Sequence, residues 1–190
     1  KEVEQMKILG TSLLVFTAII MSGCVPSLHR FYSEGDLVFN NCLIGKWTDV
    51  EYKDSWHFER RGPKKYRLTQ VNEDGESTLF EAALFTVGGR TYLDLTPIQD
   101  LENYGPSLLR THSLMAISIE TDKLRVSYID PRWLKGHLAR YPDTLKHTFV
   151  DDELVLTDTT ENLQALLRRS ANSPGIFGQT EEIIRQGENK

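Results

Sequence analysis

Short runs in which apolar and polar residues alternate fill the chain between residues 44 and 158, and this pattern predicts a β-rich domain. β-branched and aromatic residues recur at every second position of a run, and turn residues separate the runs at intervals of about 8 to 12 residues. Asp74-Gly75 and Gly88-Gly89 supply the positive-φ residues that tight hairpins need. We expect eight strands, at residues 44–50, 56–60, 65–71, 77–87, 90–95, 111–120, 123–129 and 153–157.

Two helices are also expected, both in the C-terminal third of the chain. The first covers residues 130–141, where the Asp130 side chain can cap free backbone donors and Pro131 fits the first turn. The second begins at Thr159 or Thr160 and carries an apolar stripe of leucines. Arginines stand at its C-terminal end, where cations interact favourably with the helix dipole.

The number and linkage of the strands favour a closed barrel. Eight short strands joined mostly by tight hairpins leave long edges open to other chains, and closure removes those edges. The fold class expected is mainly β: an eight-stranded meander barrel with a short inserted helix and a C-terminal helix. The charged end beyond residue 170 is expected to be frayed apart from residues 176–177 and 183–184. A β-sandwich and a half-open sheet wrapped on the helices are the alternatives that the pattern leaves open.

The N-terminal residues carry a different pattern, typical of a segment that directs export. Lys7 precedes an apolar run over residues 8–21, which at about 1.5 Å of rise per residue is too short for a helix that spans hydrocarbon. Small residues follow this run, and Cys24 comes directly after them. This order predicts a signal peptide over residues 1–23. A chance cysteine after an ordinary signal peptide and a buried N-terminal helix are the alternatives.

Met21-Ser22-Gly23-Cys24 resembles the lipobox of bacterial lipoproteins. The resemblance implies that the Cys24 sulfur takes a diacylglyceryl group, that cleavage occurs just before Cys24, and that the new amino terminus is acylated. Three acyl chains would anchor the protein stably, since each buried methylene contributes about 0.8 kcal/mol. Lipoproteins of the enteric type with aspartate after the cysteine stay at the inner membrane. Val25 therefore implies a lipid-anchored protein of the bacterial cell envelope, at the outer membrane facing the periplasm.

Gly45-Lys46-Trp47, at the start of the first expected strand, resembles the Gly-x-Trp signature of lipocalins and related calycins. Eight strands followed by a helix is also the layout of those proteins, so the resemblance implies a lipocalin-like barrel. It further implies an arginine that stacks on Trp47, for which Arg168 and Arg169 are the candidates. The second lipocalin motif has its place near Thr121-Asp122-Lys123, which lacks the tyrosine of that motif.

The expected domain organisation has four parts. They are the signal peptide at residues 1–23, a lipidated N-terminus and tether at 24–41, the barrel domain at 42–158, and a C-terminal helix and tail at 159–190. The tether is expected to become ordered as it meets the barrel.

Composition and charge narrow the range of partners. The net charge of −5 argues against nucleic acid, whose binding rests on neutralising phosphates. With Cys24 lipidated, Cys42 has no partner for a disulfide, and we expect it to be a small buried side chain rather than a reactive thiol. The histidines and cysteines show no metal-ligand spacing. The partners expected are the membrane, through the N-terminal lipid, and either a small hydrophobic ligand or an envelope protein.

No stretch of the sequence shows a nucleophile elbow or a phosphate-binding loop, so we expect neither an enzyme nor a cofactor. The candidate ligand-binding residues are those that a barrel lumen could receive: Trp56, His57, Tyr66, Phe80 and His112. If the aromatic residues line a cavity, it suits an apolar or planar ligand; if they fill the lumen, the barrel is solid.

Asp94 lies in an otherwise apolar strand, and two orientations are open for it. Facing inward, it would need a cationic partner such as Arg67, Arg110 or Arg125. Facing solvent together with Tyr92, it would need none, and we favour this orientation.

The leading interpretation is a lipid-anchored envelope protein whose lipocalin-like barrel binds a small apolar molecule. It predicts a cavity of several hundred cubic ångströms inside the barrel. The alternative is an envelope module that binds a protein partner and has a filled, ligand-free barrel. An enzyme is the third possibility, and it would need His57, His112 and Asp94 to converge in one cleft.

Overall fold

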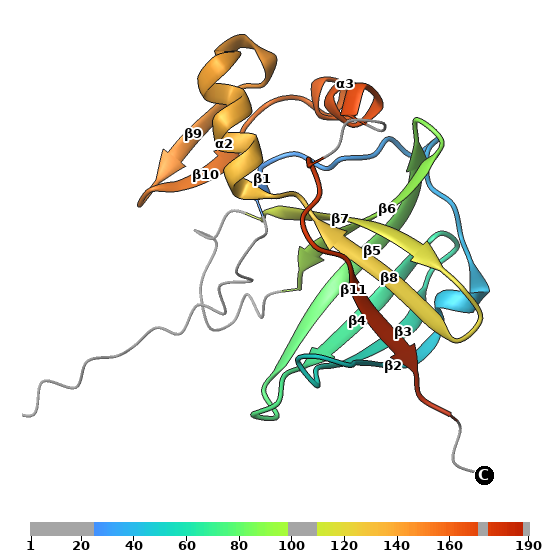
Figure 1. The fold of residues 1–190 in the computed structure, drawn as a ribbon. Helices are drawn as coiled ribbons and strands as arrows, with labels where there is room; N and C mark the ends of the chain where they lie inside the picture. Colours follow the sequence, from blue (N-terminus) through green and yellow to red (C-terminus); the bar gives the residue numbers. More distant parts are fainter. Residues whose placement is uncertain (1–24, 99–109, 171–174, 188–190) are drawn as a thin grey trace, which may run out of the picture.

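The computed structural model describes residues 25–98, 110–170 and 175–187. Within them, one sheet holds eleven strands in the order β6-β5-β4-β3-β2-β11-β8-β7-β1-β10-β9, and β6 also pairs with β7. Because of that last pairing, the strands from β2 to β8 close into a ring with β11, and every neighbouring pair in the ring is antiparallel. The prediction of an eight-stranded, lipocalin-like barrel is confirmed (Figure 1), and a sandwich or half-open sheet is excluded.

The barrel strands follow one another around the ring in chain order, as a meander requires. Their bounds are β2 Gly45–Asp49, β3 Ser55–Arg61, β4 Lys65–Val71, β5 Ser77–Val87, β6 Arg90–Pro97, β7 His112–Ile119, β8 Lys123–Tyr128 and β11 Glu181–Arg185.

The strand that closes the barrel differs from the expected one. The segment at 153–157 forms β10 (Glu153–Leu156), which pairs with β9 (His147–Val150) and with β1 (Pro26–Ser27) outside the barrel. The eighth barrel strand is β11, and it pairs with β8 on one side and β2 on the other. Ile183 is the only buried residue of β11, so apolar periodicity gave little sign of it. Backbone pairing on both edges holds β11 in place.

The Gly-x-Trp stretch lies at one end of the barrel, called the closed end below, beside the short helix η1 (Asn41–Leu43). The Trp47 indole N–H donates to the Leu43 carbonyl oxygen over 2.9 Å, and the Arg185 guanidinium lies 4.1 Å from the centre of the Trp47 ring. Gly45 has φ +126°, and a Cβ there would lie 2.8 Å from Arg185 Nη1. Glycine at this position therefore serves both the backbone conformation and the approach of the arginine.

Arg185 is the arginine that stacks on the motif tryptophan, so the expectation of Arg168 or Arg169 was wrong. Both of those residues lie in α3 (Thr160–Ser170), where Arg168 donates to the Gln164 side chain one turn earlier. Besides the stack, Arg185 donates to the carbonyl oxygens of Ile44 (3.0 Å), Thr121 (2.8 Å) and Cys42. One side chain from the last barrel strand thus joins η1, the start of β2 and the turn between β7 and β8.

Cys42 is exposed, contrary to the prediction that it is buried. It is the middle residue of η1, and only Leu43 of that helix packs into the barrel. The thiol therefore lies at the surface of the closed end.

A second apolar cluster covers the outer wall formed by β5, β6 and β7. It is built from the segment at 25–39, α2 (Pro131–Arg140), α3 and β10, which lie together on one side of the barrel (Figure 1). The Asp130 side chain caps α2 by accepting from two backbone N–H groups, as expected. η2 (Pro142–Thr144) connects α2 to β9.

The segment expected to be a tether packs against the barrel from its first described residue. Val25, Phe31, Tyr32 and Leu37 are all buried, and the backbone N–H of Val38 donates to the Leu84 carbonyl over 2.9 Å. The apolar residues of this segment have no regular period, because bends and a turn at residues 34–36 interrupt it and it forms neither a helix nor a long strand. Residues 1–24, which include the predicted signal peptide and the four residues that resemble a lipobox, lie outside the described residues. None of the helices that the structure describes is long and apolar enough to cross a bilayer.

Candidate functional site

The inward-facing side chains of the barrel form one buried cluster, and most of them have no exposed surface at all. Those at 0% exposure include Trp47, Phe58, Tyr66, Leu68, Ala82, Leu93, Leu95, Met115, Leu124, Val126 and Ile183. No water-sized space touches such side chains. Most of the lumen is therefore filled by protein, as in many small barrels.

The end of the barrel opposite η1, called the mouth below, is packed less completely. Its inward-facing residues are Asp49, Asp54, Trp56, Gln70, Thr78, Phe80, Pro97, Ser113, Tyr128 and Glu181. Trp56 at 3% and Phe80 at 6% exposure form its apolar floor, and all the others except Asp49 are partly exposed. The mouth is thus the part of the lumen that solvent reaches.

Four acidic residues surround the mouth, and together they are called the mouth carboxylates: Asp49, Glu51, Asp54 and Glu181. Asp49 is 4% exposed, and one of its oxygens accepts the backbone N–H groups of Glu51 and Tyr52 at 2.8 Å, which fixes the turn between β2 and β3. Asp54 lies across from Asp49 and accepts from the Gln70 side chain over 3.0 Å. Within the described ranges none of the four carboxylates forms an ion pair with a lysine or arginine.

The negative charges of the other three acids act on the Glu181 carboxyl. Partial burial raises the pKa of the Glu181 carboxyl, and repulsion from Asp49, Glu51 and Asp54 raises it further. The four carboxylates therefore repel one another.

The Trp56 indole N–H is buried and has no acceptor among the described residues. Trp56 lies on β3 directly opposite Trp47, one inward position below the Asp49–Asp54 pair. The Trp47 indole, by contrast, donates to the Leu43 carbonyl. Native structures seldom leave such a donor unpaired, because the lost hydrogen bond costs roughly 1–3 kcal/mol. The Tyr92 hydroxyl, in the apolar cluster outside the barrel, is the other buried side-chain polar atom without a described partner.

The five ligand-binding candidates from the sequence separate into two groups. Trp56, Tyr66 and Phe80 face the lumen, but Tyr66 is deep, and its hydroxyl is already bonded to the backbone N–H and carbonyl of Asn40. His57 and His112 face outward, because each is adjacent in its strand to an inward-facing residue. Only Trp56 and Phe80 lie at the mouth.

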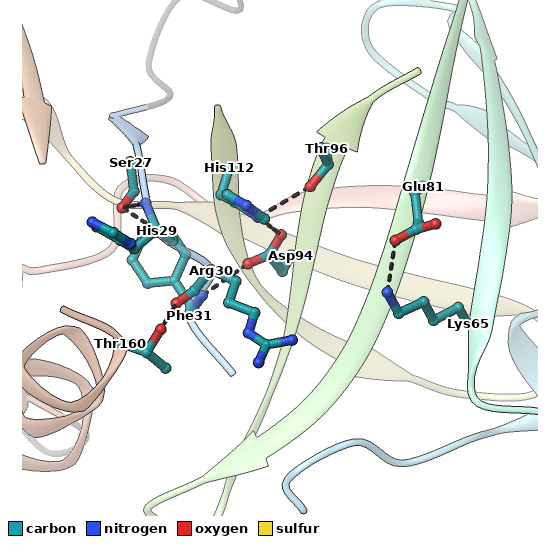
Figure 2. Close-up of polar contacts among 10 residues, drawn as sticks. All are labelled: Ser27, His29, Arg30, Phe31, Lys65, Glu81, Asp94, Thr96, His112 and Thr160. Atoms are coloured by element: carbon teal, nitrogen blue, oxygen red, sulfur yellow. Dashed lines mark hydrogen bonds and ion pairs between the residues drawn. The ribbon is translucent and has the colours of Figure 1, made fainter. Parts of the chain in front are cut away.

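Buried Asp94 and partly buried His112 form a polar pair on the outer wall (Figure 2). Asp94 is 1% exposed; it accepts from His112 Nδ1 over 2.7 Å and from the Phe31 backbone N–H over 2.9 Å. Asp94 points outward, so the orientation toward the lumen with an arginine partner is wrong. The favoured orientation toward solvent is also wrong, because the segment at 25–39 covers Asp94. The contact with Thr96 Oγ1, at 3.0 Å, also uses His112 Nδ1. The pair joins the N-terminal segment to the barrel.

His57 does not approach this pair. β3 and β7 lie on opposite sides of the eight-stranded ring, and both histidines point away from the lumen. The three residues whose convergence would have favoured an enzyme therefore do not share a cleft. Among the residues that the structure describes, no group of three or more His, Cys, Asp or Glu side chains could hold a metal ion.

No family model matches the chain, and neither curated proteins nor solved structures give a match.

Proposed function

We propose that this protein is a lipid-anchored component of the bacterial cell envelope whose barrel mouth binds a small, largely apolar molecule. The observation that carries the proposal is the contrast within the lumen: the interior is filled, whereas Trp56 and Phe80 form an apolar floor at the solvent-reached end. The cavity of several hundred cubic ångströms that the leading interpretation requires is not found among the described residues, and a filled interior is what the ligand-free alternative expects. A small molecule could therefore bind only at the mouth.

The position of β1 supports a role for the anchor in this binding. β1 pairs with His112 and Ser113, the first residues of β7, and β7 begins at the mouth. Cys24 precedes Val25 directly, and neighbouring Cα atoms are about 3.8 Å apart. An acylated Cys24 would therefore hold the mouth close to the bilayer without an intervening spacer.

Metabolic labelling with a palmitate analogue tests the anchor, and the chain offers a matched control in its second cysteine. We expect the wild type and Cys42→Ser to carry label and to sediment with membranes. Cys24→Ser should lose both properties. An unlabelled, soluble wild-type protein would exclude the anchoring part of the proposal.

Native mass spectrometry of protein extracted from membranes tests ligand binding. We expect a mass increment beyond the acylated chain in the wild type, and we expect Phe80→Asp to lose it. Leu79→Asp is the matched control, because Leu79 is the preceding residue of β5, faces outward and is 40% exposed. Retention of the increment by Phe80→Asp would place the ligand elsewhere.

A second function, binding of an envelope protein, is favoured by a different observation. Among the strands that the structure describes, β9 is an edge strand that pairs only with β10, and its residues Phe149 and Val150 are each 55% exposed. An edge strand with exposed apolar side chains can receive an extended segment of another protein. Crosslinking in intact envelopes, with Phe149→Ser as the test and Leu79→Ser as the control, would detect such a partner.

A further inference from the structure

We propose that the partner of the β9 edge is a second copy of this chain, which pairs antiparallel with β9 about a two-fold axis beside Thr148. The inference rests on the second proposed function, because it names the protein that this edge would receive.

The outer side of β9 is the one free edge of the described sheet. Every other strand in that sheet has neighbours on both sides, whereas β9 pairs only with β10. β1 and β10 separate β9 from the barrel strand β7, and the β9–β10 hairpin lies on the outside of the molecule (Figure 1). The strand contains no proline, lysine or carboxylate, which are residues that commonly protect an edge. Among the described strands, β9 is therefore the place where another strand can add.

The hydrogen-bond pattern determines which backbone groups of β9 point to the free side. The Thr157 N–H donates to the Lys146 carbonyl oxygen over 3.0 Å, in the same register as the rest of the hairpin. Hydrogen-bonded and non-hydrogen-bonded pairs alternate along an antiparallel ladder, so every second residue from Lys146 onward bonds to β10. The N–H and C=O groups of His147 and Phe149 consequently point outward.

These two residues select the register of a symmetric pair, in which both copies use the same surface. With the axis beside Thr148, His147 of each copy lies opposite Phe149 of the other, and their outward backbone groups bond to one another. An axis beside Phe149 would place His147 opposite Asp151, which has φ +47° and lies beyond the strand. An axis beside His147 would place Phe149 opposite Leu145, which is buried. The axis beside Thr148 also brings the exposed Phe149 ring against a His147 ring, as an aromatic cross-strand pair.

Charge at the ends of β9 is self-complementary, which favours a second copy as the partner. Lys146 precedes the strand, and Asp151 and Asp152 form the turn after it. These three residues are exposed, and none of them takes part in an ion pair within the described ranges. Antiparallel pairing brings the basic end of each copy to the acidic end of the other, so opposite charges meet at both ends of the pair.

Oxidative crosslinking of introduced cysteines in intact envelopes tests the register. A four-residue edge buries less surface than the roughly 1,200 Å² of a stable interface, so we expect a reversible dimer that a disulfide traps. The full chain carries Cys42→Ser in every variant, and this background without an added cysteine is the blank. Residues in a non-hydrogen-bonded pair have Cα atoms about 4.5 Å apart, within the range of a disulfide. Thr148 would face its own copy in this way.

The matched control for Thr148→Cys is Val150→Cys, because Val150 lies on the same strand and the same face and is 55% exposed. In the proposed register the two copies of Val150 are offset by roughly 13 Å along the strand. We expect Thr148→Cys to give at least about fivefold more disulfide-linked dimer than Val150→Cys. Two differently tagged copies, one with Lys146→Cys and the other with Val150→Cys, should crosslink with each other, because these positions lie opposite.

Reversal of charge tests the complementarity in the Thr148→Cys background. Lys146→Glu should lower the yield of dimer several-fold, because it places a carboxylate near those of the other copy. Addition of Asp151→Asn and Asp152→Asn should restore most of the yield, since asparagine tolerates positive φ and carries no charge. Lys146 also interacts with Asp158 of its own chain, but loss of that interaction would not be rescued at 151 and 152.

The outcomes separate this inference from the function on which it rests. Equal yields of dimer from Thr148→Cys and Val150→Cys, or no dimer from either, would overturn the pairing of two copies. A crosslinked product that contains a different envelope protein, and that Phe149→Ser abolishes, would retain the second function and exclude the second copy as partner. If Phe149→Ser alters no crosslinked product, the second function and the inference both fall.

Discussion

Replacement of Arg185 by methionine tests the idea that one side chain secures the closure of the barrel. Methionine keeps much of the length and apolar character of arginine, but it has no donor and no charge. The variant therefore loses the stack on Trp47 and the hydrogen bonds to three carbonyl groups, while β11 keeps its backbone pairing.

The expected loss follows from these contacts. The stack at 4.1 Å is worth about 0.5–2 kcal/mol, since the arginine is partly exposed. Each carbonyl contact contributes about 0.5–1.5 kcal/mol, and water can replace those to Thr121 and Cys42, which are exposed. We expect the free energy of unfolding to fall by about 2–4 kcal/mol, a large part of the 5–15 kcal/mol typical of a domain.

Urea unfolding followed by tryptophan fluorescence and circular dichroism measures this change, and an unaltered slope with urea would show that the unfolded state is unaffected. The matched control is Arg125→Met, on the outer face of neighbouring β8, where the arginine pairs only with exposed Glu120 and Glu182. We expect little effect from the control. Equal loss in the two variants, or a loss below about 1 kcal/mol for Arg185→Met, would refute the reasoning.

Three further outcomes are expected. Because burial and repulsion raise the pKa of Glu181 above its unfolded value, ionised Glu181 destabilises the fold as pH rises. Glu181→Gln should therefore increase the free energy of unfolding at pH 7 by less than about 1 kcal/mol, because solvent screens this half-exposed carboxylate. Below about pH 4, where the carboxyl is protonated in both states, the substitution should give no gain. Urea unfolding at both pH values measures the change, and a loss of stability at pH 7 would contradict the prediction. Burial of Asp158 would raise its pKa, but hydrogen bonds from the Lys146 backbone N–H and the start of α3 lower it. Asp158→Ala should cost about 2–4 kcal/mol at pH 7, and the difference from wild type should shrink as pH falls through the lowered pKa. Trp47→Phe breaks a hydrogen bond, whereas Trp56→Phe does not. In the same assay, Trp47→Phe should therefore lower the free energy of unfolding by at least about 1 kcal/mol more than Trp56→Phe does.

The strands from 44 to 129 could be predicted because inward-facing apolar residues alternate along each of them and because, apart from the long connection after β6, each ends at a turn or a helix cap with its own chemistry. β11 could not, since one buried isoleucine among charged residues carries almost no periodicity. For the segment at 25–39, packing was predicted only near its end, at Leu37, Val38 and Phe39, and its earlier buried residues were missed. Its buried residues are irregularly spaced, and they become meaningful only when the outer wall of β5, β6 and β7 is in place.

Part of the candidate site followed from alternation within strands. Trp56 and Phe80 face the lumen as expected, and His57 lies between two inward-facing aromatic residues, so its outward orientation was available from the sequence. The pairing of Asp94 with His112 was not. The residues between β6 and β7 form a long connection, and without a tight turn the register of those two strands cannot be read from the sequence.

Residues 129–180 separate β8 from β11, and β11 pairs Arg185 with Trp47 near the other end of the chain. During synthesis, seven consecutive strands can therefore emerge and fold into an incomplete cylinder whose two free edges, β2 and β8, must wait for the final strand. Contacts so distant in sequence form slowly, and unpaired edges attract foreign strands in the meantime. Premature termination shortly before residue 181 would consequently yield an aggregation-prone product rather than a slightly smaller soluble one.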